Sequence, residues 1–140
     1  MRTITNILYI ASIYFMLSCK ESSTEYKTES FIKTLWTLES FEISGKINNP
    51  PEGQRYNIAF LENGTFSGQS DCNEINGYYT INSEYLLTID SIVTTEKYCG
   101  TESLGDNYFK ALRVAKSYEL SENKLFIHYG IDSKLNFIVE

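Results

Sequence analysis

The sequence contains few of the residues that mark disordered, collagen-like or linker proteins. It has only two prolines and eight glycines in 140 residues, whereas 42% of the residues are hydrophobic and 14% aromatic. Disordered chains bury too little apolar surface to offset the entropy of folding, and this chain does not share that shortage. The composition therefore indicates one small globular domain.

Positive charge and histidine are also scarce. Twelve Lys and Arg against eighteen Asp and Glu give a formal net charge of -6, and there is a single histidine. Nucleic-acid-binding proteins hold phosphates with clustered basic residues, and no basic stripe is present here. Nucleic acid is therefore not an expected partner, and the acidic excess favours solubility.

No hydrophobic run is long enough to cross a membrane as a helix, and the longest run lies at the N-terminus. Residues 7–17 are mainly apolar, follow Arg2 and end before Ser18-Cys19, which is the order of a signal peptide. This run is too short to span a bilayer as a helix. The ending Met16-Leu17-Ser18-Cys19 resembles the bacterial lipobox. That resemblance implies removal of residues 1–18 and lipidation of Cys19, which would anchor the protein in a membrane. An ordinary secretory signal with an incidental cysteine is the alternative.

The segment after Cys19 bears on where the protein is anchored. Residues 19–30 are polar without an apolar period, which is typical of a flexible tether. Lys20 stands where an aspartate would resemble an inner-membrane retention signal, so we expect the outer membrane. The pair Lys20-Glu21 resembles surface-export signals of some lineages, which leaves periplasmic and surface exposure both open.

Cysteines are few, and their number is odd. Lipidation of Cys19 would account for one and leave Cys72 and Cys99 as a pair in an oxidising compartment. We expect a disulfide, which would stabilise the fold by roughly 3 to 4 kcal/mol. Two free thiols are the alternative. A zinc site would need further ligands at short spacing, and His128 lies in an alternating strand pattern, so no metal is expected.

Most of the remaining chain alternates apolar and polar residues with period two, which predicts antiparallel strands. The expected strands cover residues 35–43, 56–60, 65–67, 79–81, 85–89 with a continuation at 91–95, 118–120, 125–129 and 135–139. Asn63-Gly64 predicts a tight hairpin turn. The period changes once, between residues 104 and 115, which predicts a helix with Thr101 or Ser103 as its N-cap. Residues 31–140 should form a mainly β (α+β) domain, a curved antiparallel sheet or partial barrel of about eight strands with one packed helix.

Two motifs in this region resemble the META domain family, also called HslJ-like. Cys72-Asn73-x-x-x-Gly77-x-Tyr79 is similar to the family pattern G-C-N-x-x-x-G-x-Y, and Thr94-Thr95-x-x-x-Cys99 is similar to T-T-x-M-A-C. Asp71 replaces the first glycine, and Lys97-Tyr98 replaces Met-Ala. The resemblance implies a mainly β domain of bacterial envelope lipoproteins, some linked to heat shock, antibiotic tolerance or secretion, with no established catalytic residue.

Candidate functional residues are few. Asn73 and Gly77 are expected to shape a tight turn, with ligand contact as the alternative for Asn73. His128 is expected to be a solvated strand residue. Asp71, Glu96 and Glu102 could converge near the cysteine pair, but scattered carboxylates usually solvate a surface. The eleven tyrosines suit a thin β core better than a binding face.

These observations favour a non-enzymatic envelope lipoprotein without a cofactor, acting by binding a protein partner or by supporting the envelope under stress. The alternative is a small secreted inhibitor or ligand-binding module that uses the loop at residues 48–54, which contains both prolines.

Overall fold

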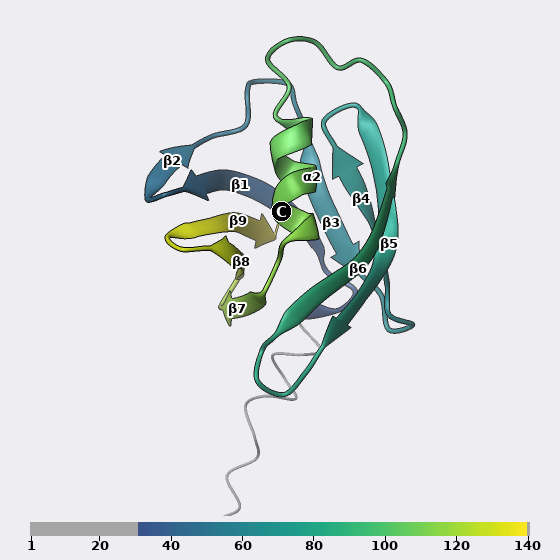
Figure 1. Cartoon of the computed structure of the whole chain (residues 1–140), viewed down its shortest axis with the longest axis vertical. Helices are drawn as coiled ribbons and strands as arrows, with labels where there is room; N and C mark the ends of the chain where they lie inside the picture. Colours follow the sequence, from purple (N-terminus) through teal and green to yellow (C-terminus); the bar gives the residue numbers. More distant parts are fainter. Residues whose placement is uncertain (1–30, 140) are drawn as a thin grey trace, which may run out of the picture.

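The computed structural model of the chain describes residues 31–139, which form nine strands and one helix (Figure 1). The elements are β1 (Leu35–Ile43), β2 (Lys46–Asn48), β3 (Tyr56–Phe60), β4 (Thr65–Ser70), β5 (Asn73–Ile81), β6 (Leu87–Thr94), α2 (Gly105–Arg113), β7 (Ser117–Ser121), β8 (Lys124–Gly130) and β9 (Ser133–Val139). The predicted signal peptide and tether lie outside the described residues. Within residues 31–139, no helix is long and apolar enough to cross a membrane.

The strands form one antiparallel sheet in the order β6-β5-β4-β3-β1-β9-β8-β7, with the short β2 paired to β1. The sheet curls until its two edge strands approach each other. Leu86 bridges Ser117, and the amide of Leu87 donates to the carbonyl of Lys116 at 3.0 Å. This contact closes one end of the curl. The sheet and the helix together confirm the prediction of a mainly β, curved antiparallel sheet with one packed helix.

The helix fills the gap where β6 and β7 diverge. α2 contacts β6, β4 and β8, and Figure 1 shows it lying along the open side of the curled sheet. Its buried residues are Tyr108, Ala111 and Leu112, which share one face because they recur at three and four residues. The helix thereby completes the core that the sheet leaves open.

Three local predictions need correction. The N-cap of α2 is Leu104, without a side-chain hydrogen bond, although the Ser103 hydroxyl accepts a bond from the Gly105 amide at 3.2 Å. β5 begins at Asn73 rather than at residue 79. The predicted segments 85–89 and 91–95 form one strand, β6, that begins at Leu87. The Asn82 side chain accepts bonds from the amides of Glu84 and Leu86, in the turn between β5 and β6. These bonds keep residues 84–86 out of the strand.

Tyrosine fills much of the core, as expected. Tyr56, Tyr79, Tyr108 and Tyr118 are buried, and the hydroxyls of Tyr79 and Tyr108 donate to backbone carbonyls at 2.7 and 3.1 Å. The ring of Phe41 meets those of Tyr56 and Tyr108 edge-to-face. Aromatic rings thus supply apolar volume while their polar ends are satisfied.

These buried rings predict a loss of stability at alkaline pH. Burial raises the pKa of Tyr79 and Tyr108 in the native state, whereas the unfolded chain ionises near about pH 10. Because the native pKa is raised, this stabilisation is fully present below about pH 10 and is lost as pH rises through the native pKa. Urea unfolding should therefore give a constant free energy from pH 7 to 9 that falls above about pH 10. Tyr108→Phe should make the fall shallower, and an unchanged slope in this variant would contradict the explanation.

Candidate functional site

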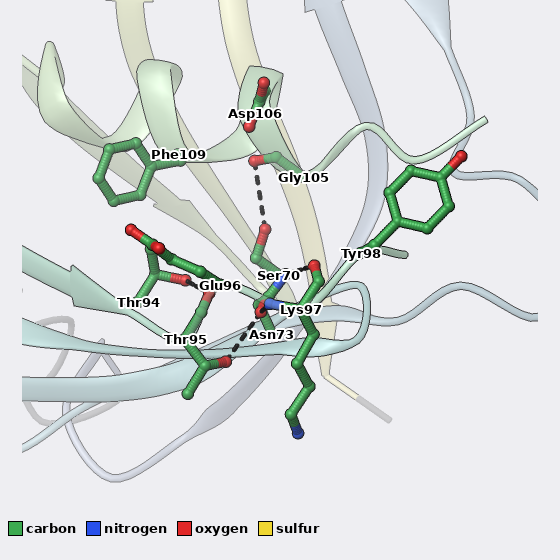
Figure 2. A pocket seen from close by; sticks show the side chains of 10 residues that line it. All are labelled: Ser70, Asn73, Thr94, Thr95, Glu96, Lys97, Tyr98, Gly105, Asp106 and Phe109. Carbon is green, nitrogen blue, oxygen red and sulfur yellow. Dashed lines mark hydrogen bonds between the residues drawn. The ribbon is translucent and has the colours of Figure 1, made fainter. Parts of the chain in front are cut away.

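The cysteine motifs meet where β6 ends. Residues 94–99, here called the strap, run beside the start of β5. The Asn73 Oδ1 atom accepts bonds from the Thr95 hydroxyl at 2.8 Å and the Lys97 amide at 2.7 Å, and its Nδ2 atom donates to the Lys97 carbonyl at 3.0 Å (Figure 2). The Nδ2 atom also donates to Cys99 Sγ at 3.1 Å. The sequence predicted that Asn73 shapes its own tight turn, and this prediction is wrong. Asn73 fixes a segment that lies more than twenty residues further along the chain.

Two further connections hold the strap. Cys72 and Cys99 are joined by a disulfide, the pairing expected of the two cysteines that remain after Cys19. Thr95 continues the ladder past β6, since its amide donates to the Glu74 carbonyl at 3.2 Å and its hydroxyl accepts a bond from the Glu74 amide at 3.1 Å. The strap is thus fixed by the Asn73 side-chain amide, a disulfide and two hydrogen bonds between Thr95 and Glu74.

A pocket of about 420 Å³ separates the strap from the first turns of α2. Its lining residues are Ser70, Asn73, Thr94, Thr95, Glu96, Lys97, Tyr98, Gly105, Asp106 and Phe109. Figure 2 shows Phe109 on the helix side and Thr94 and Glu96 opposite it, while the Lys97 side chain points away from the helix. Sequence reasoning missed the helix residues of this wall, because the apolar period marks only the face of α2 that is buried.

The floor of the pocket is a buried polar contact. Ser70, at the end of β4, donates its hydroxyl proton to the Gly105 carbonyl at 3.2 Å. A Cβ atom at Gly105 would lie 3.2 Å from the hydroxyl oxygens of both Ser70 and Ser103. The glycine therefore lets the start of the helix approach the sheet closely.

The other motif residues lie outside this site. Gly77 is in the middle of β5, with a negative φ, and not in a tight turn as predicted. Its Cα faces the carbonyl of Ser91 and the ring of Phe66, where a Cβ atom would collide with both. Tyr79 is buried in the core. Both residues serve the packing of β5 between its neighbours.

The three candidate carboxylates do not share one site. Glu96 lines the strap pocket, whereas Glu102 is exposed and does not line it. Asp71 lies before the disulfide with a φ of +58°, and its Oδ2 atom is buried without a hydrogen-bond partner. Burial raises the pKa of Tyr56, and the nearby negative charge of Asp71 adds to that rise.

Asp71 therefore predicts a stabilising substitution. A left-handed φ favours glycine, and a buried unpaired oxygen costs about 1 to 3 kcal/mol. Asp71→Gly, which restores the residue of the family pattern, should raise the free energy of unfolding by about 1 kcal/mol or more in urea titrations. Asp90→Gly, which removes the same charge from an exposed position, is the control and should not stabilise the protein. Equal effects of the two substitutions would mean that charge alone is responsible.

His128 lies at a different place on the surface. Its Nε2 atom is 3.8 Å from a Glu119 carboxylate oxygen, and both side chains are partly exposed. They line a second pocket of about 380 Å³ where Glu84 and Tyr85 meet β7. Ser117, the cross-strand partner of His128, lines it too. No side-chain hydrogen bond joins Ser117 to His128 in the described structure, so a nucleophile and base are not aligned there. Among residues 31–139, no group of three or more His, Cys, Asp or Glu is placed to hold a metal ion.

Comparison with known structures shows the same fold at low sequence identity. An NMR structure of a protein from Burkholderia xenovorans is 18% identical, with a TM-score of 0.70 and coverage of 82% of this chain and 87% of that one. A crystal structure of a DUF4847 family protein from Bacteroides vulgatus is 19% identical, with a TM-score of 0.58 and coverage of 79% and 94%. A further NMR structure is 21% identical, with a TM-score of 0.61 and coverage of 79% and 92%.

Curated proteins offer no match to this sequence. The family model of the META domain, in contrast, matches residues 29–140, a stretch that includes both cysteine motifs, the strap and α2. The chain therefore belongs to the META domain family.

Proposed function

We propose that the protein is a lipid-anchored envelope protein whose META domain binds a partner in the pocket between the strap and α2, without catalysing a reaction. The observation that carries this proposal is the rigid attachment of the strap. Asn73, the disulfide and the Thr95–Glu74 pair all hold the wall of one pocket in place. A wall that is fixed before binding lowers the entropy cost of association.

The arrangement of side chains supports binding rather than catalysis. The oxygen of the Asn73 amide already accepts two bonds and its nitrogen already donates, so this motif residue has little capacity left for a substrate. Glu96 and Asp106 are exposed carboxylates, and the pair of His128 and Glu119 lines a different pocket. General acid–base catalysis requires groups within hydrogen-bond reach of one reacting atom.

Anchoring in the outer membrane is the second part of the proposal. It rests on the lipobox-like ending Met16-Leu17-Ser18-Cys19 and on Lys20 directly after it. Cys19→Ala should move the protein from the membrane fraction to the soluble fraction or leave it unprocessed. A variant that is processed and fractionates like the parent protein would disprove lipidation at this position.

A role in envelope stress is the third part, and it is tested together with the pocket. A deletion strain should grow less well than its parent under heat, detergent or antibiotic stress. Thr94→Trp places a large ring at the pocket wall, whereas Thr88→Trp adds the same ring at an exposed position of the same strand. The parent gene and Thr88→Trp should restore growth, and Thr94→Trp should not. Equal rescue by both variants would exclude the pocket.

The loop at residues 48–54 supports a second candidate, an inhibitor or ligand-binding module. Its last residue, Gln54, accepts a hydrogen bond from the Tyr56 hydroxyl at 2.6 Å, and the same hydroxyl accepts a bond from the Leu104 amide at 2.9 Å. The loop is thereby anchored beside the entry to α2. Capture of a stoichiometric protease from an envelope extract, lost on deletion of residues 49–53, would favour this candidate.

A further inference from the structure

The outer face of β4, β5 and β6 carries a pocket of about 370 Å³ that has no part in the strap site. The strand register arranges its side chains in two rows across the three strands. Thr65, Tyr78 and Ser91 form one row, and Ser67, Asn76 and Val93 form the other. Neighbouring strands are about 4.8 Å apart, so each row is a short, regular array.

This array contains no charged side chain, although the whole chain has a net charge of -6. The uncharged surface continues onto β3 and β1 through Ala59 and Leu35, which lie in the row of Ser67. Carboxylates stand at its margins, where Glu74 precedes Asn76 by two residues on β5 and Asp90 precedes Ser91 on β6. An anionic ligand would be repelled by this margin, and a basic one would find no charged partner in the centre.

The centre of the array offers free hydrogen-bonding groups. Within residues 31–139, the side chains of Ser67, Asn76 and Ser91 take part in no intramolecular hydrogen bond or ion pair. Beside them, Tyr78 is 61% exposed and Val93 is 70% exposed. Hydroxyl and amide groups flanked by an exposed aromatic ring suit a ligand that has both hydroxyl groups and apolar ring faces.

From this combination we infer that the outer pocket on β4, β5 and β6 is a binding site for a neutral oligosaccharide. Sugar hydroxyls would exchange hydrogen bonds with Ser67, Asn76 and Ser91, and the C–H face of a sugar ring would pack on Tyr78. The absence of formal charge in the array matches an uncharged glycan chain. This site is separate from the strap pocket, so either can fail without the other.

The test uses the full chain purified in detergent and three neutral probes: cellohexaose, chitohexaose and maltohexaose. Isothermal titration calorimetry should detect binding of at least one of them, while hexagalacturonic acid, an anionic chain of equal ring number, should bind at least about tenfold more weakly. No binding of any neutral probe, or equal binding of the anionic chain, would overturn the inference.

Two variants locate the site. Asn76→Asp introduces a charge at the centre of the array, and Tyr78→Ala removes the ring, so each should weaken binding of the neutral probe at least about tenfold. Thr80→Asp adds the same charge to an exposed position of β5 outside the pocket and should bind like the parent. Circular dichroism and sedimentation accompany each variant. Unchanged binding by Asn76→Asp and Tyr78→Ala would overturn the assignment. So would a parent protein that binds no glycan and sediments as a dimer, if Asn76→Asp dissociates that dimer.

Discussion

Replacing Gly77 with valine should strongly lower the free energy of unfolding of the protein. A Cβ atom at this position would collide with the Ser91 carbonyl of β6 and would lie 2.6 and 2.7 Å from two ring carbons of Phe66. Neither neighbour can move easily, because Ser91 is held in the ladder with β5 and Phe66 is buried in the core. We expect a loss of about 4 kcal/mol or more, a large part of the stability of a small domain. Urea unfolding followed by circular dichroism measures it.

Gly130→Ala is the matched control for this substitution. Gly130 is also a strand glycine without a positive φ, but a Cβ atom there would lie 3.4 Å from the Ser133 side chain, an ordinary contact. It should change the free energy of unfolding by less than about 1 kcal/mol. If Gly77→Val unfolds at the same urea concentration as Gly130→Ala, the close approach of β5, β6 and Phe66 does not restrict the size of the side chain at residue 77.

The importance of Gly77 could be predicted from the sequence, but its reason could not. Asn73 and Gly77 are residues typical of tight turns, so local propensity placed a turn there and began the strand at residue 79. In the structure, Ile75, Gly77 and Tyr79 form the inward face of one continuous strand. The tertiary packing of β6 and Phe66 outweighs the local preference, as is common in sheets. By contrast, the Asn63-Gly64 turn forms as predicted, with a φ of +77° at Gly64, because β3 and β4 pair directly on either side.

The strap shows the same limit of local reasoning. The sequence indicated that Asn73 has a structural role, but its partners Thr95 and Lys97 are more than twenty residues away. No spacing rule predicts a side-chain bond across such a distance before the register of β5 and β6 is known. The pairing of the cysteines was accessible because only two remained after Cys19. The pocket itself was not, since it forms between the strap and residues of α2 that lie off the apolar face of the helix.

The second large effect concerns the disulfide. Cys72→Ala combined with Cys99→Ala should lower the free energy of unfolding by roughly 3 to 4 kcal/mol, because the bond closes a loop between residues 27 apart in the sequence. The midpoint of thermal unfolding should fall by about 10 °C or more. Both substitutions are made together, so that no unpaired thiol remains to form a disulfide between two molecules. Reactive thiols at Cys72 and Cys99 in the native, oxidised parent protein would contradict the bond.

Comparison with Asn73→Ala separates the covalent contribution from the hydrogen bonds of the strap. The disulfide acts mainly on the unfolded chain, so its removal should expand that state and increase the dependence of unfolding free energy on urea, the m-value. Asn73→Ala removes native contacts to Thr95 and Lys97 and leaves the cross-link in place, so it should lower the free energy by about 1 to 3 kcal/mol at an unchanged m-value. If the double cysteine variant also keeps the parent m-value, the bond stabilises the native strap rather than restricting the unfolded chain. The strap pocket would then depend on the redox state of its two cysteines as strongly as on Asn73.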